Sequence, residues 1–340
     1  MRLALALVLV TSLAAQDPKF GVQSRLVLVP VTVLDAKGRS VEGLELSDFL
    51  VYDNGVPRRP SVDTFATGVA PIALVVAVQS SGISIAVLEK VQKIGSMIQP
   101  LITGERGCAA LLSFDDRLRW RQECTRDPDA LAKAFAALTP GEHKTARMLD
   151  AAHEAIASLR KRANVRRVLL LISESRDRGS ESELAAVIMD AQAAGVTVYV
   201  ATYSAVKTAF TTRTSNPEPA TEPVTPRPNR TGTITPQGRA PLPGPDGRAD
   251  ILGGLGELAR LAKVKDADAL SSQTGGVTFP FTRQKGLENA IEKLGAELHS
   301  QYLLSFSPEN ATPGFHQLEI RINRPGKFRV RARPGYWSSM

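Results

Sequence analysis

Nearly continuous apolar runs that alternate with amphipathic stretches place the strongest constraint on how this chain can fold. The apolar runs cover residues 72–79, 107–114, 166–173, 196–202 and 276–281. The amphipathic stretches cover residues 84–101, 129–138, 145–162, 181–194, 250–264 and 284–300. Strands without polar alternation are buried on both faces, and strands that alternate with helices are joined by crossovers. The pattern predicts an α/β unit with a mostly parallel sheet and helices on both faces.

One pair of strands in this unit must be antiparallel. Only a short polar turn separates residues 107–114 from residues 118–124, and it is too short for a crossover connection. If the two strands pair without a shift in register, Cys108 faces Cys124. A cross-strand disulfide fits that geometry, and an oxidising compartment favours it. Two unpaired thiols are the alternative that the spacing leaves open.

The segments on either side of the α/β unit are predicted to form β-structure. Residues 25–65 contain a β-branched run and the hairpin signal Asp53-Asn54-Gly55, since Asn and Gly tolerate a positive φ. Residues 301–338 contain further strand-like runs separated by Pro, Gly and Asn. We expect these two segments to pair with each other in one small sandwich-like module beside the α/β unit, which spans residues 70–300.

The first fifteen residues have the pattern of a secretory signal peptide. A basic Arg2 precedes an apolar stretch that ends in small residues. No later segment approaches the ~20 apolar residues of a membrane-spanning helix. We therefore expect residues 1–15 to be a signal peptide, the protein to be exported to the periplasm or the extracellular space, and the chain to have no transmembrane segment.

Residues 208–249 interrupt the α/β pattern. They are rich in Pro, Thr and Gly and contain few large apolar residues. Such a composition cannot bury enough apolar surface to offset the entropy of ordering the segment. Because the alternating pattern resumes afterwards, we interpret this segment as a disordered insertion within the unit.

The formal net charge of +8 has one conspicuous concentration. Lys327, Arg329, Arg331 and Arg333 alternate with apolar residues, and a period of two places all four cations on one face of a strand. Such a basic strand is either a solvated sheet face or a contact for an anionic polymer of the cell envelope. Export, an aromatic content of 5% and the absence of a recognition motif argue against nucleic acid as the partner.

Three stretches within residues 70–300 resemble the von Willebrand factor type A (VWA) domain. They are VQSSGIS after the first apolar run, LLISESRDRGS, and LSSQTGGVTF. The flanking β segments resemble those around VWA domains in an acidobacterial type of secreted VWFA-related protein. The resemblance implies a Rossmann-like sheet with one antiparallel edge strand, and a function in adhesion or protein binding.

The resemblance also places a candidate binding site. The family's metal-ion-dependent adhesion site (MIDAS) binds Mg²⁺ through Asp-x-Ser-x-Ser, a Thr from a second loop and an Asp after the fourth strand. The matching positions here are Gln79, Ser81, Ile83, Thr145 and Glu174. Mg²⁺ needs hard oxygen ligands in nearly octahedral geometry. Gln79 lacks the charge, Ile83 lacks a lone pair and Glu174 is one methylene too long, so we expect a degenerate site without Mg²⁺ or another cofactor.

The sequence supports an enzymatic function of the same loop less well than a binding function. Ser80 and Ser81 lie on a strand-to-helix turn, but a hydrolase nucleophile elbow needs Gly on both sides of the Ser, and for Ser80 the upstream position is Val78. None of the four histidines has a neighbour at zinc-ligand spacing. We expect a non-enzymatic protein that binds an unknown protein partner. The alternative is a structural or envelope-associated module that binds an anionic polymer through residues 327–333.

Overall fold

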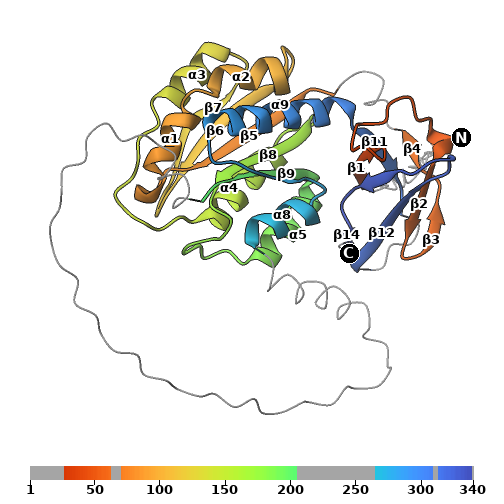
Figure 1. Ribbon diagram of the computed structural model, residues 1–340. Helices are drawn as coiled ribbons and strands as arrows, with labels where there is room; N and C mark the ends of the chain where they lie inside the picture. The colour runs from red at the N-terminus through yellow and green to blue at the C-terminus, as the bar shows by residue number, and fades with distance from the viewer. Residues whose placement is uncertain (1–26, 63–69, 205–264, 309–312, 339–340) are drawn as a thin grey trace, which may run out of the picture.

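The computed structural model describes residues 27–62, 70–204, 265–308 and 313–338. Its larger part is an α/β unit built on a six-stranded sheet of order β10-β9-β8-β5-β6-β7 (Figure 1). The strands are β5 (Ile72–Gln79), β6 (Cys108–Phe114), β7 (Leu118–Thr125), β8 (Arg166–Ser173), β9 (Val196–Thr202) and β10 (Thr278–Pro280). All neighbours are parallel except β6 and β7. The predicted Rossmann-like sheet with one antiparallel edge strand is confirmed.

Helices cover both faces of this sheet, as predicted (Figure 1). One face packs against α4 (Met148–Arg160), α5 (Leu184–Ala194) and α8 (Asp266–Gln273). The other packs against α1 (Ile85–Val91), α2 (Gly95–Ile98), α3 (Pro128–Ala136) and α9 (Gln284–Ser300). Since β5 is buried along its whole length, its apolar run contributes to both layers.

The prediction of one helix over residues 84–101 is wrong. A 3-10 turn, η3 (Gly82–Ser84), precedes α1, and a π-helical turn, η4 (Gln99–Thr103), follows α2. Gly95 lies so close to α3 that a Cβ there would be 2.9 Å from the Ala132 Cα. Gly and Pro are the two poorest residues for a helix interior, and here Gly95 begins α2 and Pro100 lies in the π-helical turn. The predictions for residues 1–15, 208–249 and 250–264 lie outside the described residues.

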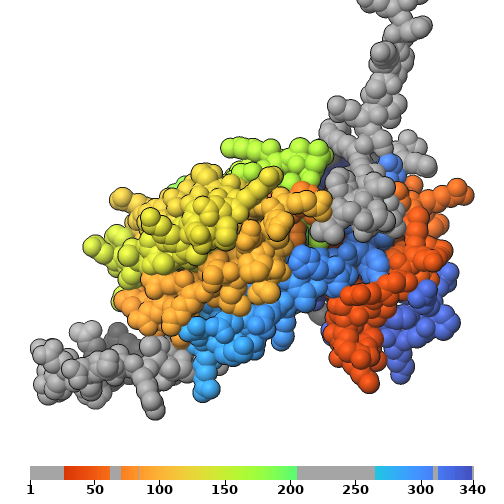
Figure 2. Space-filling view, turned by 90° about the horizontal axis from the view of Figure 1, so that it is seen from above, coloured from red at the N-terminus to blue at the C-terminus, as the bar shows by residue number. Residues whose placement is uncertain are grey.

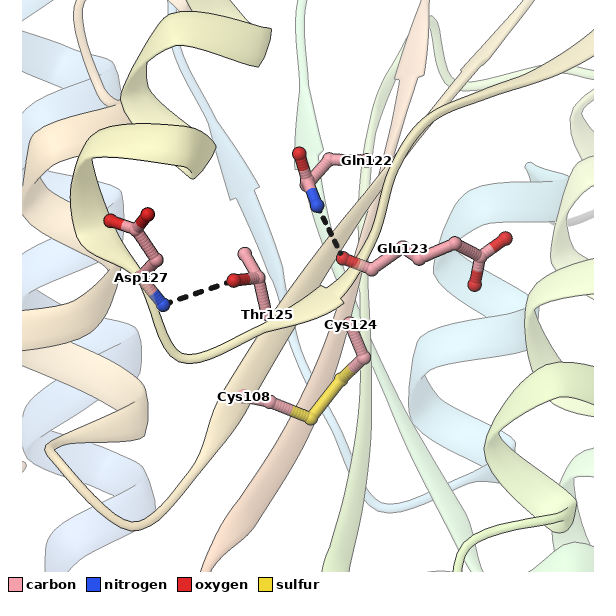
Figure 3. The surroundings of a disulfide bond; sticks show 6 residues. All are labelled: Cys108, Gln122, Glu123, Cys124, Thr125 and Asp127. Carbon is pink, nitrogen blue, oxygen red and sulfur yellow. Dashed lines mark hydrogen bonds between the residues drawn. A yellow bond between two sulfur atoms is a disulfide. The ribbon is translucent and has the colours of Figure 1, made fainter.

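The edge strand β7 carries a disulfide between Cys124 and Cys108 of β6 (Figure 3). The two Cα atoms are 5.4 Å apart, so the predicted disulfide is formed. The predicted unshifted register is wrong, however. The pairing shifts twice along the hairpin, so that Ala109 faces Thr125. Two irregularities in the ladder displace Cys124 from the position directly opposite Cys108, and the side chains still meet.

The smaller part is a β module of two four-stranded sheets, β13-β1-β11-β4 and β14-β12-β2-β3. Its elements are β1 (Val27–Leu34), η1 (Leu46–Asp48), β2 (Phe49–Asp53), β3 (Val56–Arg58), β4 (Ser61–Val62), β11 (Tyr302–Phe306), β12 (Gly314–Ile322), β13 (Arg329–Arg331) and β14 (Gly335–Ser338). Strand β1 pairs with β11 and β13, and β2 pairs with β12. The two terminal β segments therefore share one module. Asn54 and Gly55 both have positive φ and form the predicted hairpin turn between β2 and β3.

Helix α9 extends from the α/β unit to the β module, which lies beside it in both views (Figures 1 and 2). Glu297 of α9 accepts a hydrogen bond from the Tyr199 hydroxyl of β9 at 2.9 Å and forms an ion pair with Arg331 of β13. Burial, together with the neighbouring Glu297 charge, raises the pKa of Tyr199 well above its ordinary value, so the hydroxyl stays a donor. One carboxylate thus ties the central sheet to the module.

Candidate functional site

The candidate site lies at the carboxyl ends of the parallel strands, where ligands of open α/β sheets bind. The loop after β5 packs directly on residues 141–147. The Gly141 N–H donates to the Ser80 carbonyl at 2.6 Å, and the Gly82 N–H donates to the His143 carbonyl at 2.8 Å. A Cβ at Gly141 would lie 2.0 Å from a carboxylate oxygen of Asp115, so only glycine allows this approach. The loop after β5 and residues 141–147 therefore form one continuous surface, which we call the rim.

A third loop joins the rim from β8. The backbones of Ala146 and Arg178 exchange two hydrogen bonds of 3.0 Å each. This short bridge brings residues 141–147 beside residues 174–182, which contain Glu174. The three loops that the sequence resemblance assigns to one site are therefore adjacent in the structure.

A buried chain of hydrogen bonds crosses the centre of the rim. The Glu174 N–H donates to Gln79 Oε1 at 2.9 Å, and Gln79 Nε2 donates to Ser81 Oγ at 2.9 Å. Ser81 Oγ lies 3.1 Å from Ser84 Oγ, which lies 2.7 Å from the Tyr203 hydroxyl. Gln79, Ser81 and Ser84 are at most 1% exposed. The structure thus brings Gln79, Ser81 and the Glu174 backbone together and adds Ser84 and Tyr203.

The Gln79 amide determines the chemistry at this point. Its carbonyl and its NH₂ group are both engaged, and the NH₂ group presents a donor to the Ser81 oxygen. In the family's site a carboxylate and a serine oxygen would both face the cation. Burial also raises the pKa of Tyr203 far above its ordinary value, so the far end of the chain stays a neutral hydroxyl. The centre of the rim is a neutral, internally bonded network.

The carboxylate of Glu174 is balanced from its own loop. Its side chain is 13% exposed, and Oε2 lies 3.1 Å from Nε of Arg178, four residues later. The guanidinium supplies a positive charge next to the carboxylate that corresponds to the last MIDAS ligand. Arg178 thus provides a counter-charge for Glu174, whose buried Oε2 accepts no hydrogen bond among the described residues.

Two further acids of the rim, Asp177 and Asp150, also accept hydrogen bonds. Asp177 accepts hydrogen bonds from the Leu149 N–H at 3.0 Å and the Ser180 hydroxyl at 2.6 Å. Asp150 accepts from Arg147 Nε at 2.6 Å, and although burial acts to raise its pKa, hydrogen bonds from Ser182 and other donors lower it below the usual value. In the part of the chain that the structure describes, no group of three or more His, Cys, Asp or Glu side chains is arranged to hold a metal ion.

The remaining predicted positions do not join this network. Thr145 is exposed on the rim and lies beside Gly179, where a Cβ would be 3.9 Å from its methyl group. The side chain of Ile83 lies outside the described residues. Sequence reasoning missed Ile85, which is 56% exposed at the start of α1. Its only signal is a large apolar residue directly after the polar loop.

The predicted basic strand is wrong as a single solvent-facing row of four cations. Strand β13 ends at Arg331, so the alternation does not continue to Arg333. Lys327 and Arg329 are exposed, but Arg331 is paired with Glu297. Arg333 is only 6% exposed, and its Nη1 donates to the Gln192 carbonyl of α5 at 3.0 Å.

Comparisons with known proteins extend these observations. No family model matches the chain, and no curated protein matches its sequence significantly. Among solved structures, a von Willebrand factor type A protein from Catenulispora acidiphila is 10% identical with a TM-score of 0.44, and covers 82% of this chain and 51% of its own length. An aerotolerance-related membrane protein from Bacteroides fragilis is 14% identical with a TM-score of 0.41, and covers 66% of this chain and 98% of its own.

A third structure is proximal thread matrix protein 1 from the mussel byssus with a zinc-occupied MIDAS motif. It is 12% identical with a TM-score of 0.43, and covers 72% of this chain and 48% of its own length. The strand order, with antiparallel β7 at one edge, gives the α/β unit the VWA fold that the sequence resemblance predicts. Among the described helices, none is both long and apolar enough to cross a membrane.

Proposed function

We propose that this chain is an exported, non-enzymatic protein that binds another protein through the loops at the carboxyl edge of its sheet, without a metal ion. The observation that carries the proposal is the buried chain from the Glu174 backbone through Gln79, Ser81 and Ser84 to Tyr203. The Cys108–Cys124 disulfide supports export, because such bonds persist in oxidising compartments.

The hydrogen bonds that an ion would have to displace support metal independence. Mg²⁺ dehydrates reluctantly and needs several oxygen ligands in near-ideal geometry. Binding at this rim would break the Gln79–Ser81 hydrogen bond and compete with Arg178 for Glu174. A buried donor left without its acceptor costs about 1–3 kcal/mol. The neutral Gln79 amide would attract the ion only weakly, because it carries no negative charge.

Protein binding is supported by the surface of the rim. Ile85 is an apolar side chain that is 56% exposed at the start of α1, and exposed large apolar residues can serve as anchors of an interface. A hollow of about 290 Å³ lies at the same edge of the sheet. Ser175, Thr202, Tyr203, Lys265 and Phe281 contribute to its lining. The rim thus combines a projecting apolar residue with a concave neighbour.

A non-enzymatic role is supported by the state of the two serines. The Ser80 hydroxyl donates to the Phe114 carbonyl at 3.3 Å, and the Ser81 hydroxyl bonds to Gln79 and Ser84. These partners are not general bases, which a serine nucleophile needs. Binding of an anionic polymer is the weaker alternative, because Arg331 is already paired and Arg333 is buried.

Calorimetric titration of the protein with Mg²⁺ and Mn²⁺ tests metal independence. We expect no saturable heat from the parent chain. We expect saturable binding by the variant Gln79→Asp, Ile83→Ser, Glu174→Asp, because it restores the family's oxygen ligands. Tight binding of either ion by the parent would overturn the metal-free assignment.

Substitution of Ile85 by glutamate tests the binding surface. We expect Ile85→Glu to weaken capture of partner proteins from exported or envelope fractions by about tenfold or more, since burying an unpaired charge at an interface costs several kcal/mol. Leu50→Glu is the matched control, because Leu50 is an equally apolar residue, 37% exposed, on β2 of the module. Quantitative cross-linking measures the captured partner protein for the parent and for each of the two variants, with and without EDTA. Equal loss in the two variants, or loss with EDTA alone, would contradict the proposal.

A further inference from the structure

We propose that a cavity between the α/β unit and the β module binds a small organic carboxylate. The cavity has a volume of about 160 Å³ and lies at the amino ends of β8 and β9. The recognition rim is at the opposite, carboxyl edge of the same sheet. The cavity is therefore a second site, and the proposal does not depend on the function assigned to the rim.

The walls of the cavity come from both parts of the molecule and carry an unbalanced positive charge. Leu28, Pro30 and Leu303 come from β1 and β11 of the module. The cationic lining residues are Arg166, Arg167 and Arg333. Among the described residues that line it, none is Asp or Glu. Three arginines thus contribute to a wall in which the described lining residues include no acid.

Of the three arginines, Arg333 has the greatest need of a negatively charged partner, because its charge is buried. It is only 6% exposed, and Nη1 donates to the Gln192 carbonyl. Its Nε is buried without a hydrogen-bond partner in the described part of the chain. Burial lowers the pKa of Arg333 to about 10, so the group is still charged at neutral pH. Its guanidinium also lies over the Tyr336 ring, with Cζ 6.0 Å from the ring centre, but no carboxylate among the described residues pairs with it. A buried charge is destabilising unless an opposite charge accompanies it.

The other two arginines do not obtain a carboxylate from the lining either. Arg166 donates to the Gln301 side-chain oxygen at 2.7 Å and to the Leu298 carbonyl. Arg167 donates to the Ala194 carbonyl at 2.7 Å and to the Arg162 carbonyl at 2.6 Å. These acceptors are neutral. Burial lowers the pKa of both arginines, which is the direction expected when the charge is not fully compensated.

The acid that acts on Arg166 is already paired with other groups. Glu297 acts electrostatically on Arg166, but its carboxylate already binds Arg331 and the Tyr199 hydroxyl. Because Glu297 is shared with Arg331, it does not neutralise the positive charge of the cavity wall. An anion inside the cavity would supply the missing charge.

The size and the apolar part of the lining define the class of anion. A cavity of about 150 Å³ holds a ligand the size of benzene. Apolar side chains form much of the wall, among them Val165, Val168 and Leu298. A carboxylate matches the planar fork of arginine, and a compact apolar body matches the remaining wall. A small aromatic or branched aliphatic carboxylate fits these features better than a fully hydrated inorganic anion.

Titration of the full-length protein with sodium benzoate, at constant ionic strength, tests the proposal. We expect saturable binding by the parent chain. We expect Arg333→Gln to weaken binding about tenfold or more, because removal of a charged partner of a buried ion pair costs several kcal/mol. Arg329→Gln is the matched control, since Arg329 is exposed and does not line the cavity, and it should bind like the parent.

A second variant leaves all arginines in place. Ala70 lines the cavity and is buried, so Ala70→Ile should fill part of the space and weaken benzoate binding about tenfold or more. This variant decides the question if Arg333→Gln does not fold. The proposal is wrong if the parent shows no saturable benzoate binding, or if Ala70→Ile binds as the parent does. Binding of sodium sulfate in place of benzoate would overturn the assignment to a carboxylate.

Discussion

Replacement of Asp53 by alanine is expected to lower the free energy of unfolding by about 3–5 kcal/mol, the usual cost of removing one partner from a buried charged group. Asp53 is 1% exposed at the end of β2. Its carboxylate lies 2.9 Å from His316 Nδ1, accepts from the Tyr336 hydroxyl at 3.2 Å and lies 3.4 Å from an Arg58 nitrogen. Alanine would leave three polar groups without their shared acceptor.

The pKa of Tyr336 supports this view of Asp53. Burial raises the pKa of the tyrosine far above its ordinary value, and the Asp53 charge and hydrogen bond raise it further. The hydroxyl is therefore a permanent donor to the carboxylate. Tyr336 also stacks on the His316 ring at a centroid distance of 4.9 Å, so the loss of Asp53 would disturb the packing of β12 and β14 together.

Urea denaturation followed by circular dichroism measures the effect of Asp53→Ala. The matched control is Glu319→Ala, which removes a 51% exposed carboxylate on β12 that pairs with Arg321. An exposed ion pair contributes about 0–1 kcal/mol, so the control should unfold close to the parent. If Asp53→Ala loses less than about 1 kcal/mol, the buried cluster does not stabilise the module as argued.

The double variant Cys108→Ser, Cys124→Ser is expected to lose about 3 kcal/mol of stability, because a crosslink that closes a loop of about 15 residues restricts the unfolded chain by that amount. The two cysteines are 16 residues apart in the sequence. The bond holds the outermost strand β7, which has a single neighbour in the sheet. At about 2–4 °C per kcal/mol for a domain of about 150–250 residues, the melting temperature of the α/β unit should fall by about 6–12 °C.

Differential scanning calorimetry with and without reductant separates the disulfide from the cysteine side chains. Reductant should lower the melting temperature of the parent toward that of the double variant and leave the variant unchanged. A parent that melts at the same temperature as the variant under oxidising conditions would show that the crosslink does not contribute. The rim lies at the other end of β6, so protein binding should survive in the variant.

The sequence was enough to predict where the candidate site lies. It was not enough to predict the hydrogen bonds that its side chains make. The resemblance placed Gln79, Ser81 and Glu174 in one site, because the loops after parallel strands converge on one edge of a sheet. The partner of Ser84 could not be found this way. Tyr203 lies 119 residues further along the chain, and no local pattern relates the two. The hydrogen bonds of the rim depend on side chains from distant segments, so only the three-dimensional structure shows them.

The sequence by itself determined the alternation of strands and helices and the antiparallel edge hairpin, and it made a disulfide between the two cysteines one of two open alternatives. These features depend on hydrophobic periodicity and short connections, which are local properties. Tertiary structure alone decided that Arg333 is buried against α5, that the first helical region is divided into α1, α2 and η4, and that the register of the edge hairpin shifts twice. Such features depend on packing between distant segments, since a residue's burial is set by the elements that cover it and not by its neighbours in the chain.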